Sequence, residues 1–478
     1  MLTIPTLEDL NLGVTVPALS IATWACLLLL IDLWVPKAHK ERTAWLAAGG
    51  VVFAFVVTLF TFQTTGDAFM GLFRADEFTA FINLAVLLTA FISILLSIDY
   101  LKRAGIERGE YYVLLLFTTS GAMFMASAND LITVFVALEL LSIPLYILSA
   151  FRAPEPKSEE SGMKYFILGA FASAFFAYGA ALVYGATGST NIPEIFATVE
   201  RVVAESSTAI FLLLLGAGLM LVGLGFKVAV VPFHTWTPDV YEGAPTPVTA
   251  FMSVAAKIGG FAALLRIMAV GLPEFVLVEG QINAAWQQTV ALVAAATLIL
   301  ANLVAIWQNN IKRLLAYSSI AHAGYIMMAV AAAGTLGVAD LAVRGALFYL
   351  IAYAVSNLGA FAIAMQVERN DATGTDLNNF VGLGKTQPLL AFMMAVFMLS
   401  LTGIPLTSGF IGKWFVFGAT IEAGLVGLAV VGVLTSVVSA YYYIRVIVNM
   451  YLRDPDAETP ASDLPGATPL LNWGVYAA

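Results

Sequence analysis

Long apolar runs recur along the whole chain, and each is long enough to cross the hydrocarbon core of a lipid bilayer. A helix of about 20 apolar residues spans that core. Backbone groups without a hydrogen-bond partner cannot lie in hydrocarbon, so each run predicts a helix rather than a loop or an open strand. Thirteen windows have this character: 15–35, 43–63, 77–98, 111–127, 130–151, 163–185, 208–231, 247–270, 288–306, 314–333, 341–366, 388–420 and 423–448.

The composition agrees with a protein that lies mostly in lipid. Only 11% of the 478 residues are charged, whereas about 25% are charged in a typical soluble domain. The last apolar stretch, 470–478, is too short to cross and would be a truncated fourteenth helix. We therefore expect an all-α polytopic membrane protein with 13–14 transmembrane helices.

The connections between the windows fall into two alternating sets that differ in charge. Cytoplasmic loops are enriched in lysine and arginine, so the basic set predicts the cytoplasmic face and places the N-terminus on the opposite side. The other set holds only Arg74 and Arg201. The basic set holds thirteen residues: Lys37, Lys40, Arg42, Lys102, Arg103, Arg108, Arg152, Lys157, Lys312, Arg313, Arg369, Lys385 and Arg453.

Two windows carry helix-breaking residues. Proline removes a backbone donor and clashes with the preceding turn, so we expect breaks at Pro232 in the seventh helix and at Pro405 in the twelfth. Broken helices at corresponding places in two halves point to a transport site. The offset predicts two inverted five-helix repeats, helices 4–8 and 9–13. The expected regions are an N-terminal three-helix region at 1–110, a first half-channel at 111–270, a second half-channel at 287–449, and a cytoplasmic loop with the truncated last helix at 450–478.

Four ionisable side chains lie deep within the apolar windows. Glu139 is near the middle of the fifth helix, where a carboxylate costs about 2.5–3.5 kcal/mol, so it needs a partner in the bundle or a proton. Lys227 and Lys413 flank the two breaks, and Lys257 is central in the eighth helix. Loss of hydration favours the neutral form of a lysine. Together these residues predict a proton relay rather than a purely structural set of ion pairs.

Two further candidates are less specific. Lys164 opens the sixth helix near its cytoplasmic boundary, where a side chain that reaches for the interface explains the residue as well as function does. His322 lies inside the tenth helix. Histidine titrates near neutral pH, so His322 suits a link between two half-channels, with a hydrogen-bonded core histidine as the alternative.

The chain lacks the residues that hold common redox cofactors. It has one cysteine, Cys26, within an apolar run, and three histidines. We find no glycine-rich dinucleotide motif, no phosphate-binding loop and no Cys/His cluster for haem or iron–sulfur binding. We therefore expect no cofactor and no metal on this chain, and any redox chemistry that drives it would take place on partner subunits.

Four phrases in the sequence are long enough to be compared with known families. They are VPFHTWTPDVYEGAP within 223–266, VALELLSIPLYIL around Glu139, SSIAHAGY around His322 and LTGIPLTSGFIGKW around Lys413. Together they resemble the antiporter-like membrane subunits of respiratory complex I, the NADH–quinone oxidoreductase, and within that family the subunit N group. The resemblance covers windows 4–13. The family pattern of fourteen helices is not met, because the last one stops at Ala478.

The resemblance implies a role for individual residues. Glu139 and Lys227 would be the charged pair of the first half-channel, and Lys257 the connecting central lysine. Lys413 would be the terminal lysine of the second half, with Lys164 as a further participant. Loss of the Glu139–Lys227 pairing would then push a proton through Lys257 and His322 towards Lys413.

The resemblance also implies a setting. We expect a multi-pass protein of the bacterial cell membrane, in contact with the lipid bilayer, a neighbouring antiporter-like subunit and small helical subunits of complex I, and with no nucleic acid. FMN, iron–sulfur clusters, NADH and quinone would lie on partner subunits.

Other functions stay open at this point. A subunit of a multisubunit sodium/proton antiporter shares this architecture and would need no NADH. A stand-alone solute transporter would need more polar residues in mid-span, and a membrane scaffold would leave four buried ionisable groups unexplained. The electron donor could also be reduced ferredoxin or a deazaflavin.

Overall fold

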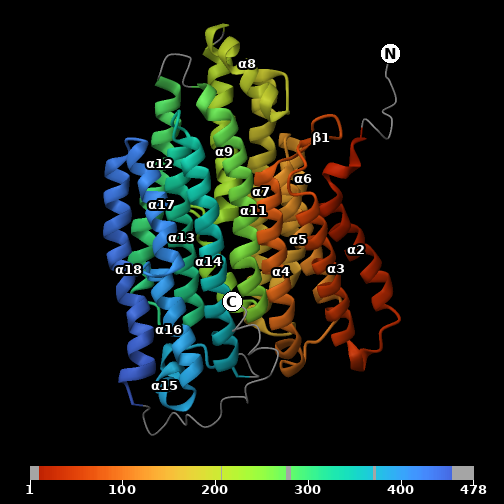
Figure 1. Ribbon diagram of the computed structural model, residues 1–478, viewed down its shortest axis with the longest axis vertical. Helices are drawn as coiled ribbons and strands as arrows, with labels where there is room; N and C mark the ends of the chain where they lie inside the picture. The colour runs from red at the N-terminus through yellow and green to blue at the C-terminus, as the bar shows by residue number, and fades with distance from the viewer. Residues whose placement is uncertain (1–9, 206, 276–280, 370–372, 455–478) are drawn as a thin grey trace.

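The protein is a bundle of long helices that run nearly parallel to its longest axis (Figure 1). The computed structural model describes residues 10–205, 207–275, 281–369 and 373–454. The elements in chain order are η1 (Leu12–Val14), α2 (Val16–Asp32), η2 (Lys37–His39), α3 (Glu41–Phe60), β1 (Gly66–Ala68), β2 (Phe73–Ala75), α4 (Glu77–Arg103), α5 (Glu110–Ser127), α6 (Leu131–Ser149), α7 (Pro156–Thr187), α8 (Ile192–Glu205), α9 (Ser207–Val228), α10 (Trp236–Gly243), α11 (Thr246–Phe275), α12 (Gln281–Ala305), α13 (Ile311–Ala333), α14 (Ala339–Val367), η3 (Leu377–Phe380), α15 (Leu383–Thr386), α16 (Pro388–Thr402), α17 (Ser408–Glu422) and α18 (Val426–Leu452).

The predicted fold class is confirmed, because every apolar window coincides with a helix. Ten helices in the described residues are long and apolar enough to cross a membrane, and α2 and α16 are shorter apolar helices. Helices dominate because each one satisfies its own backbone hydrogen bonds, as a lipid environment requires. The chain is therefore a multi-pass membrane protein.

The centre of the bundle is formed by α11, α13 and α14. The apolar window of α11 is buried over its whole length and that of α13 over 94%, whereas only 39% of the window of α12 is buried. Figure 1 shows α11, α13 and α14 at the middle of the bundle, with α18 and α2 on opposite flanks. A polar side chain on α11 or α13 therefore faces protein rather than lipid.

Both predicted helix breaks are present. The seventh helix divides into α9 and α10, separated by the non-helical residues 229–235. The twelfth divides into α16 and α17, separated by 403–407. In both places the backbone between the half-helices leaves carbonyl groups without the usual intrahelical partner.

Four details differ from the sequence prediction or lie outside it. The connection after α7 contains the amphipathic helix α8, and the stretch 66–75 contains the antiparallel pair β1–β2. Both are too short or too polar to appear in a search for membrane spans. Helix α7 begins at Pro156 rather than at 163, because Pro at the first helical position needs no donor. The predicted tail helix at 470–478 lies outside the described residues.

The two ends of the bundle differ in charge, and the predicted basic set gathers at one of them. We call this the basic end; it is formed by α15 and the connections at 33–40, 104–109, 150–155 and 306–310. Helix α15 lies at the bottom of Figure 1, and α8 and β1 lie at the top. Arg74 in β2 belongs to the opposite end.

Candidate functional site

At the first break, a lysine from a neighbouring helix binds the exposed end of α9. The Nζ atom of Lys257 on α11 donates a hydrogen bond of 2.9 Å to the carbonyl oxygen of Val228, the last residue of α9. Lys257 is buried, with 2% of its surface exposed. The carbonyl end of a helix carries partial negative charge. The ammonium group therefore satisfies both an unpaired acceptor and the helix dipole.

The second break has the same kind of contact. Helix α16 ends at Thr402, and Gly403 continues the chain in the left-handed region with φ of 85°. Lys413 on α17 donates to the carbonyl of Thr402 at 2.7 Å and to that of Leu401 at 3.4 Å. A third bond of 2.8 Å reaches the Ser436 hydroxyl on α18. Lys413 is also buried, so its charge is stabilised by dipoles rather than by water.

Lys227 lies in the last turn of α9 and is surrounded by hydroxyl groups. Its Nζ donates to Ser142 Oγ on α6 at 2.9 Å and to the Tyr165 hydroxyl on α7 at 3.3 Å. Nζ also lies 5.5 Å from the centre of the Tyr165 ring, within the range of a cation–π contact. The side chain is buried.

The structure does not bring Glu139 into direct contact with Lys227. No ion pair within 4 Å joins them among the described residues, and Glu139 Oε1 accepts no hydrogen bond from that part of the chain. Glu139 is half-buried on α6, on the side that also exposes Val136 and Ile143. The role of Glu139 and Lys227 as a charged pair, which the resemblance implies, stays a prediction, and the two side chains form no direct ion pair here. The nearest polar partner of Lys227 on α6 is Ser142, one turn further along.

His322 on α13 is held by two tyrosines from two other helices. Its Nδ1 lies 2.7 Å from the hydroxyl of Tyr349 on α14, and its Nε2 lies 3.1 Å from that of Tyr443 on α18. Tyr443 also contacts the hydroxyl of Ser318. A neutral imidazole has one donor and one acceptor nitrogen, whereas a charged one donates twice. Hydroxyl groups can serve either state, so this arrangement accepts both protonation states of His322.

Hydroxyl groups also fill the space between α11 and α13. The Tyr353 hydroxyl donates to Ser319 Oγ at 2.7 Å and to the carbonyl of Ser253 at 3.2 Å. Ser253 precedes Lys257 on α11 by one turn, and Ser319 precedes His322 on α13 by about one turn. Beyond His322, Tyr325 places its ring centre 4.6 Å from Lys413 Nζ. Polar side chains thus lie near Lys257, His322 and Lys413.

These hydroxyl residues were not predicted from the sequence. Tyrosine and serine are common in apolar helices, so no single residue stood out. The available signal was the recurrence of small polar residues on α11, where Thr246, Thr249, Ser253 and Lys257 repeat at helical spacing and are all buried.

Lys164 belongs to a different environment from the other lysines. It is 41% exposed and pairs with Asp239 at 2.7 Å and Glu160 at 2.6 Å. Asp239 on α10 also accepts from Arg313 on α13, and Arg313 reaches Glu242 as well. Lys164 is therefore part of an ion-pair network at the basic end that joins α7, α10 and α13.

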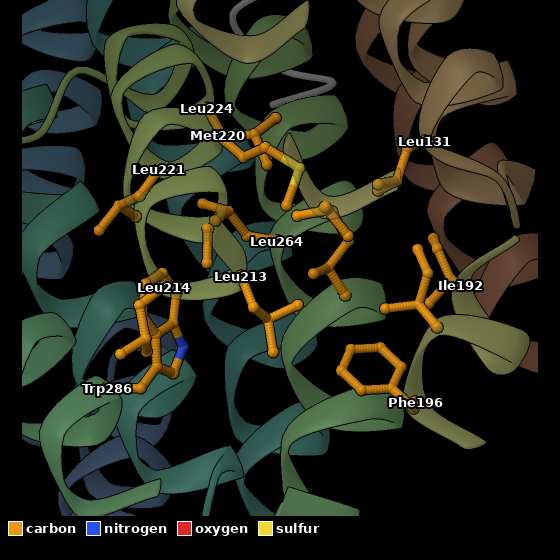
Figure 2. Close-up of a pocket in the computed structure, with 14 residues that line it drawn as sticks. Leu131, Ile192, Phe196, Leu213, Leu214, Met220, Leu221, Leu224, Leu264 and Trp286 are labelled. Carbon is orange, nitrogen blue, oxygen red and sulfur yellow. The ribbon is translucent and has the colours of Figure 1, made fainter. Parts of the chain in front are cut away.

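A separate apolar pocket lies between α8, α9, α11 and the start of α12 (Figure 2). Leu213, Leu221 and Leu264 line it together with Phe196 and Trp286, and it encloses about 70 Å³. No titratable side chain lines this pocket. It is a gap in apolar packing, and none of the buried lysines lines it. In the described residues, no group of three or more His, Cys, Asp or Glu side chains is arranged to hold a metal ion.

Comparison with known proteins places the chain in one family. Residues 128–439 match the family model described as NADH:quinone oxidoreductase/Mrp antiporter, TM. NADH-quinone oxidoreductase subunit N from Chloroflexus aggregans is 45% identical over 472 residues, covering 98% of this chain and 92% of that protein.

Solved structures agree with the sequence match. A chain of respiratory complex I from Thermus thermophilus, solved with bound aureothin, has a TM-score of 0.79 and 35% identity, covering 96% of this chain and 94% of that one. A chain of the Mrp complex from a Dietzia species has a TM-score of 0.79 at 23% identity, covering 96% and 85%, and so shares the fold.

Proposed function

The chain belongs to the NADH:quinone oxidoreductase/Mrp antiporter membrane-subunit family, and we propose that Lys227, Lys257, His322 and Lys413 carry protons through it. It is a proton-translocating membrane subunit of NADH–quinone oxidoreductase, and its partners are other membrane subunits of that complex. The complex is an oxidoreductase.

One observation carries the proposed path. The carbonyl ends of two broken helices, α9 and α16, each bind a buried lysine, and His322 with its two tyrosines lies between those lysines. Lysine and histidine exchange protons, whereas the backbone carbonyls that hold them do not. Neither Lys257 nor Lys413 forms an ion pair with a carboxylate among the described residues. No permanent negative charge therefore holds either lysine in its protonated state.

The chemistry of each step is a proton transfer between neighbouring polar groups. Lys227 exchanges its proton with the hydroxyls of Ser142 and Tyr165. Lys257 passes one towards His322 past the hydroxyls of Tyr353 and Ser319, which are hydrogen-bonded to each other. His322 then relays it through its tyrosines towards Lys413, which releases it at the opposite end. Glu139 acts on Lys227 through its charge rather than by contact, and Lys164 tunes the basic end through Asp239.

We place the electron carriers on partner subunits. One cysteine and three histidines in the whole sequence are too few for a four-cysteine cluster. FMN, iron–sulfur clusters, NADH and quinone would therefore bind elsewhere in the complex, with no redox centre on this chain. We also place the chain in the bacterial cell membrane with its basic end in the cytoplasm and its N-terminus on the other side.

The test is NADH-driven acidification of inverted membrane vesicles that contain the whole complex. Lys257→Met should lower the initial rate of acidification through this subunit by on the order of 100-fold, because a proton-transfer group typically contributes that much. Lys102→Met is the matched control, since Lys102 is an exposed lysine that pairs with Glu41 at the surface. Wild-type acidification in Lys257→Met vesicles would exclude the path. Acidification driven by a sodium gradient but not by NADH would favour the antiporter alternative.

A further inference from the structure

A polar cavity opens into the bundle at the basic end. It encloses about 140 Å³ and is lined by charged groups from four parts of the chain: Arg152 and Glu155 before α7, Lys157 on α7, Glu242 on α10, Lys312 on α13 and Glu368 after α14. A water molecule occupies about 30 Å³ in the liquid. The cavity therefore has room and polar partners for several water molecules.

Lys312 lies at the wall of this cavity and is almost fully buried, with 3% of its surface exposed. Its Nζ donates to the carbonyl oxygens of Glu242 at 2.8 Å and Ala244 at 2.7 Å. These carbonyls belong to the C-terminal end of α10, the second half of the broken seventh helix. An ammonium group has three donors, so these two bonds leave one proton for the cavity.

Two of the three carboxylates that line the cavity, Glu368 and Glu242, are engaged with other groups. Glu368 accepts from the hydroxyls of Tyr100 and Thr246 and lies 3.7 Å from Arg152. Glu242 pairs with Lys157 and with Arg313 through its side chain. Within the described chain, Lys312 has no carboxylate within ion-pair distance and is held by backbone dipoles.

This is the same environment that Lys257 and Lys413 have. Each of the three buried lysines donates to the carbonyl end of a half-helix: Lys257 to α9, Lys413 to α16 and Lys312 to α10. Lys312 differs in one respect, because it borders a polar cavity at the basic end.

We propose that Lys312 takes up protons from this cavity and feeds them to the relay. Ser319 lies seven residues further along α13, two turns away on the same side of the helix. Its hydroxyl is 3.5 Å from that of Tyr241 on α10 and 2.7 Å from that of Tyr353 on α14. Tyr241 belongs to the half-helix whose end Lys312 binds, so α10 links the cavity to the hydroxyl groups beside Lys257. This role rests on the proton-translocating function proposed above.

The substitution Lys312→Arg separates proton uptake from structure. Arginine keeps the charge and can donate to both carbonyls, but it does not release its proton in proteins. A lysine that only stabilises α10 would tolerate the change. Lys40→Arg is the matched control, because Lys40 also binds a helix-end carbonyl, that of Asp32 at 3.0 Å, and pairs with the Asp32 carboxylate.

The measurement is NADH-driven acidification of inverted vesicles over a range of external pH, since the basic end faces outwards there. Lys312→Arg should lower the initial rate about tenfold or more and flatten its pH dependence, while Lys40→Arg stays at the wild-type rate. Wild-type pumping in Lys312→Arg would overturn the role of Lys312. Lys257→Met in the same series separates failure of the relay from failure of the uptake role. If Lys257→Met and Lys312→Arg both pump normally, the proposed relay is wrong. If Lys257→Met stops pumping and Lys312→Arg pumps normally, only the uptake role of Lys312 is wrong.

A second measurement needs no variant. Reductive methylation of wild-type vesicles with formaldehyde and cyanoborohydride, read by mass spectrometry, reports amines that water reaches and that lose their proton. Lys312 should be methylated at least tenfold faster than Lys227, which is enclosed by Ser142 and Tyr165. Methylation of Lys312 no faster than that of Lys227, while exposed Lys102 reacts fully, would overturn the uptake role even if Lys312→Arg failed to assemble.

Discussion

In both broken helices a buried lysine donates to the carbonyl end of the first half-helix, but the two lysines come from different helices. At the first break the lysine on the carbonyl end of α9 comes from another helix, α11. At the second break Lys413 belongs to the continuation of the same broken helix, α17, and Ser436 assists it. The helix that supplies the lysine therefore differs between the two breaks, whereas its ammonium group lies at the carbonyl end in both. An unpaired carbonyl end inside a membrane protein needs a donor, and here that donor is also a titratable group.

The two breaks differ in the number of buried lysines beside them. The first break has a second lysine, Lys227, which binds hydroxyls on α6 and α7 rather than carbonyls. At the second break Lys413 binds the carbonyl end of α16. At the first break Lys257 has both roles, structure and proton transfer, whereas Lys227 takes part in proton transfer without binding the carbonyl end; at the second break Lys413 alone has both roles.

The largest expected effect tests this difference in roles. Lys413→Met should lower NADH-driven acidification by on the order of 100-fold and also reduce the amount of assembled complex. The Thr402 carbonyl would lose its ammonium donor, at a cost of about 1–3 kcal/mol, and keep only the 3.3 Å bond from the Ser436 hydroxyl. Lys227→Met should impair acidification to a similar degree but leave assembly unchanged, since Lys257 still binds α9. Acidification and native-gel quantification of the complex measure the two effects. Equal assembly defects in both variants would show that the two lysines do not differ in this way.

The next effect concerns the link between the two regions. Tyr443→Phe removes the hydroxyl that joins His322 to Ser318, and we expect about a tenfold loss of acidification. Tyr111→Phe is the control, because Tyr111 is a fully buried tyrosine bonded to a serine, Ser97, on helices outside the path. If both variants pump equally well, the hydroxyl of Tyr443 has only a packing role.

The sequence predicted the parts of this arrangement that depend on local chemistry. Apolar windows gave the helices, and the prolines at 232 and 405 gave the breaks, because both follow from backbone hydrogen bonding. It could not predict which groups meet across helices. Glu139 was expected to pair in charge with Lys227, but the hydrogen-bond partners of Lys227, Ser142 and Tyr165, could not be predicted, because helix rotation decides which side chains meet and leaves no local pattern. Lys312 was predicted to lie in a basic loop. Its burial could not be predicted, because it depends on α10, which packs over it.

A similar loss of acidification, together with a loss of stability, is expected at the glycine of the second break. Gly403 has φ of +85°, and a Cβ there would lie 2.8 Å from Lys413 Cδ, so Gly403→Ala adds backbone strain and displaces the lysine. Gly424 has a similar φ of +78° with nothing within 4 Å, which makes Gly424→Ala a control for strain alone. Both variants should lose about 1–2 kcal/mol of stability, and only Gly403→Ala should also lose acidification, by about tenfold. Equal pumping in the two would mean that Lys413 tolerates displacement.

The last effect is on stability alone and contrasts these dipole-held lysines with an ordinary ion pair on the central helix α11. Arg266 on α11 binds Asp76, before α4, through two bonds of 3.0 Å. Burial raises the pKa of Asp76, but hydrogen bonds and the charge of Arg266 outweigh burial and hold that pKa below its ordinary value.

Because the pKa of Asp76 is lower in the folded protein, its stabilisation is present above the unfolded value of about 3.9 and is lost as pH falls through the folded value. Asp76→Asn should therefore lower the free energy of unfolding by about 1–3 kcal/mol at neutral pH, and by less as pH falls below about 4. Thermal melting of the purified complex at several pH values measures the difference between variant and wild type. A difference that stays constant through acid pH would show that Asp76 acts through its hydrogen-bonding shape, as the carbonyl ends do, and not through its charge.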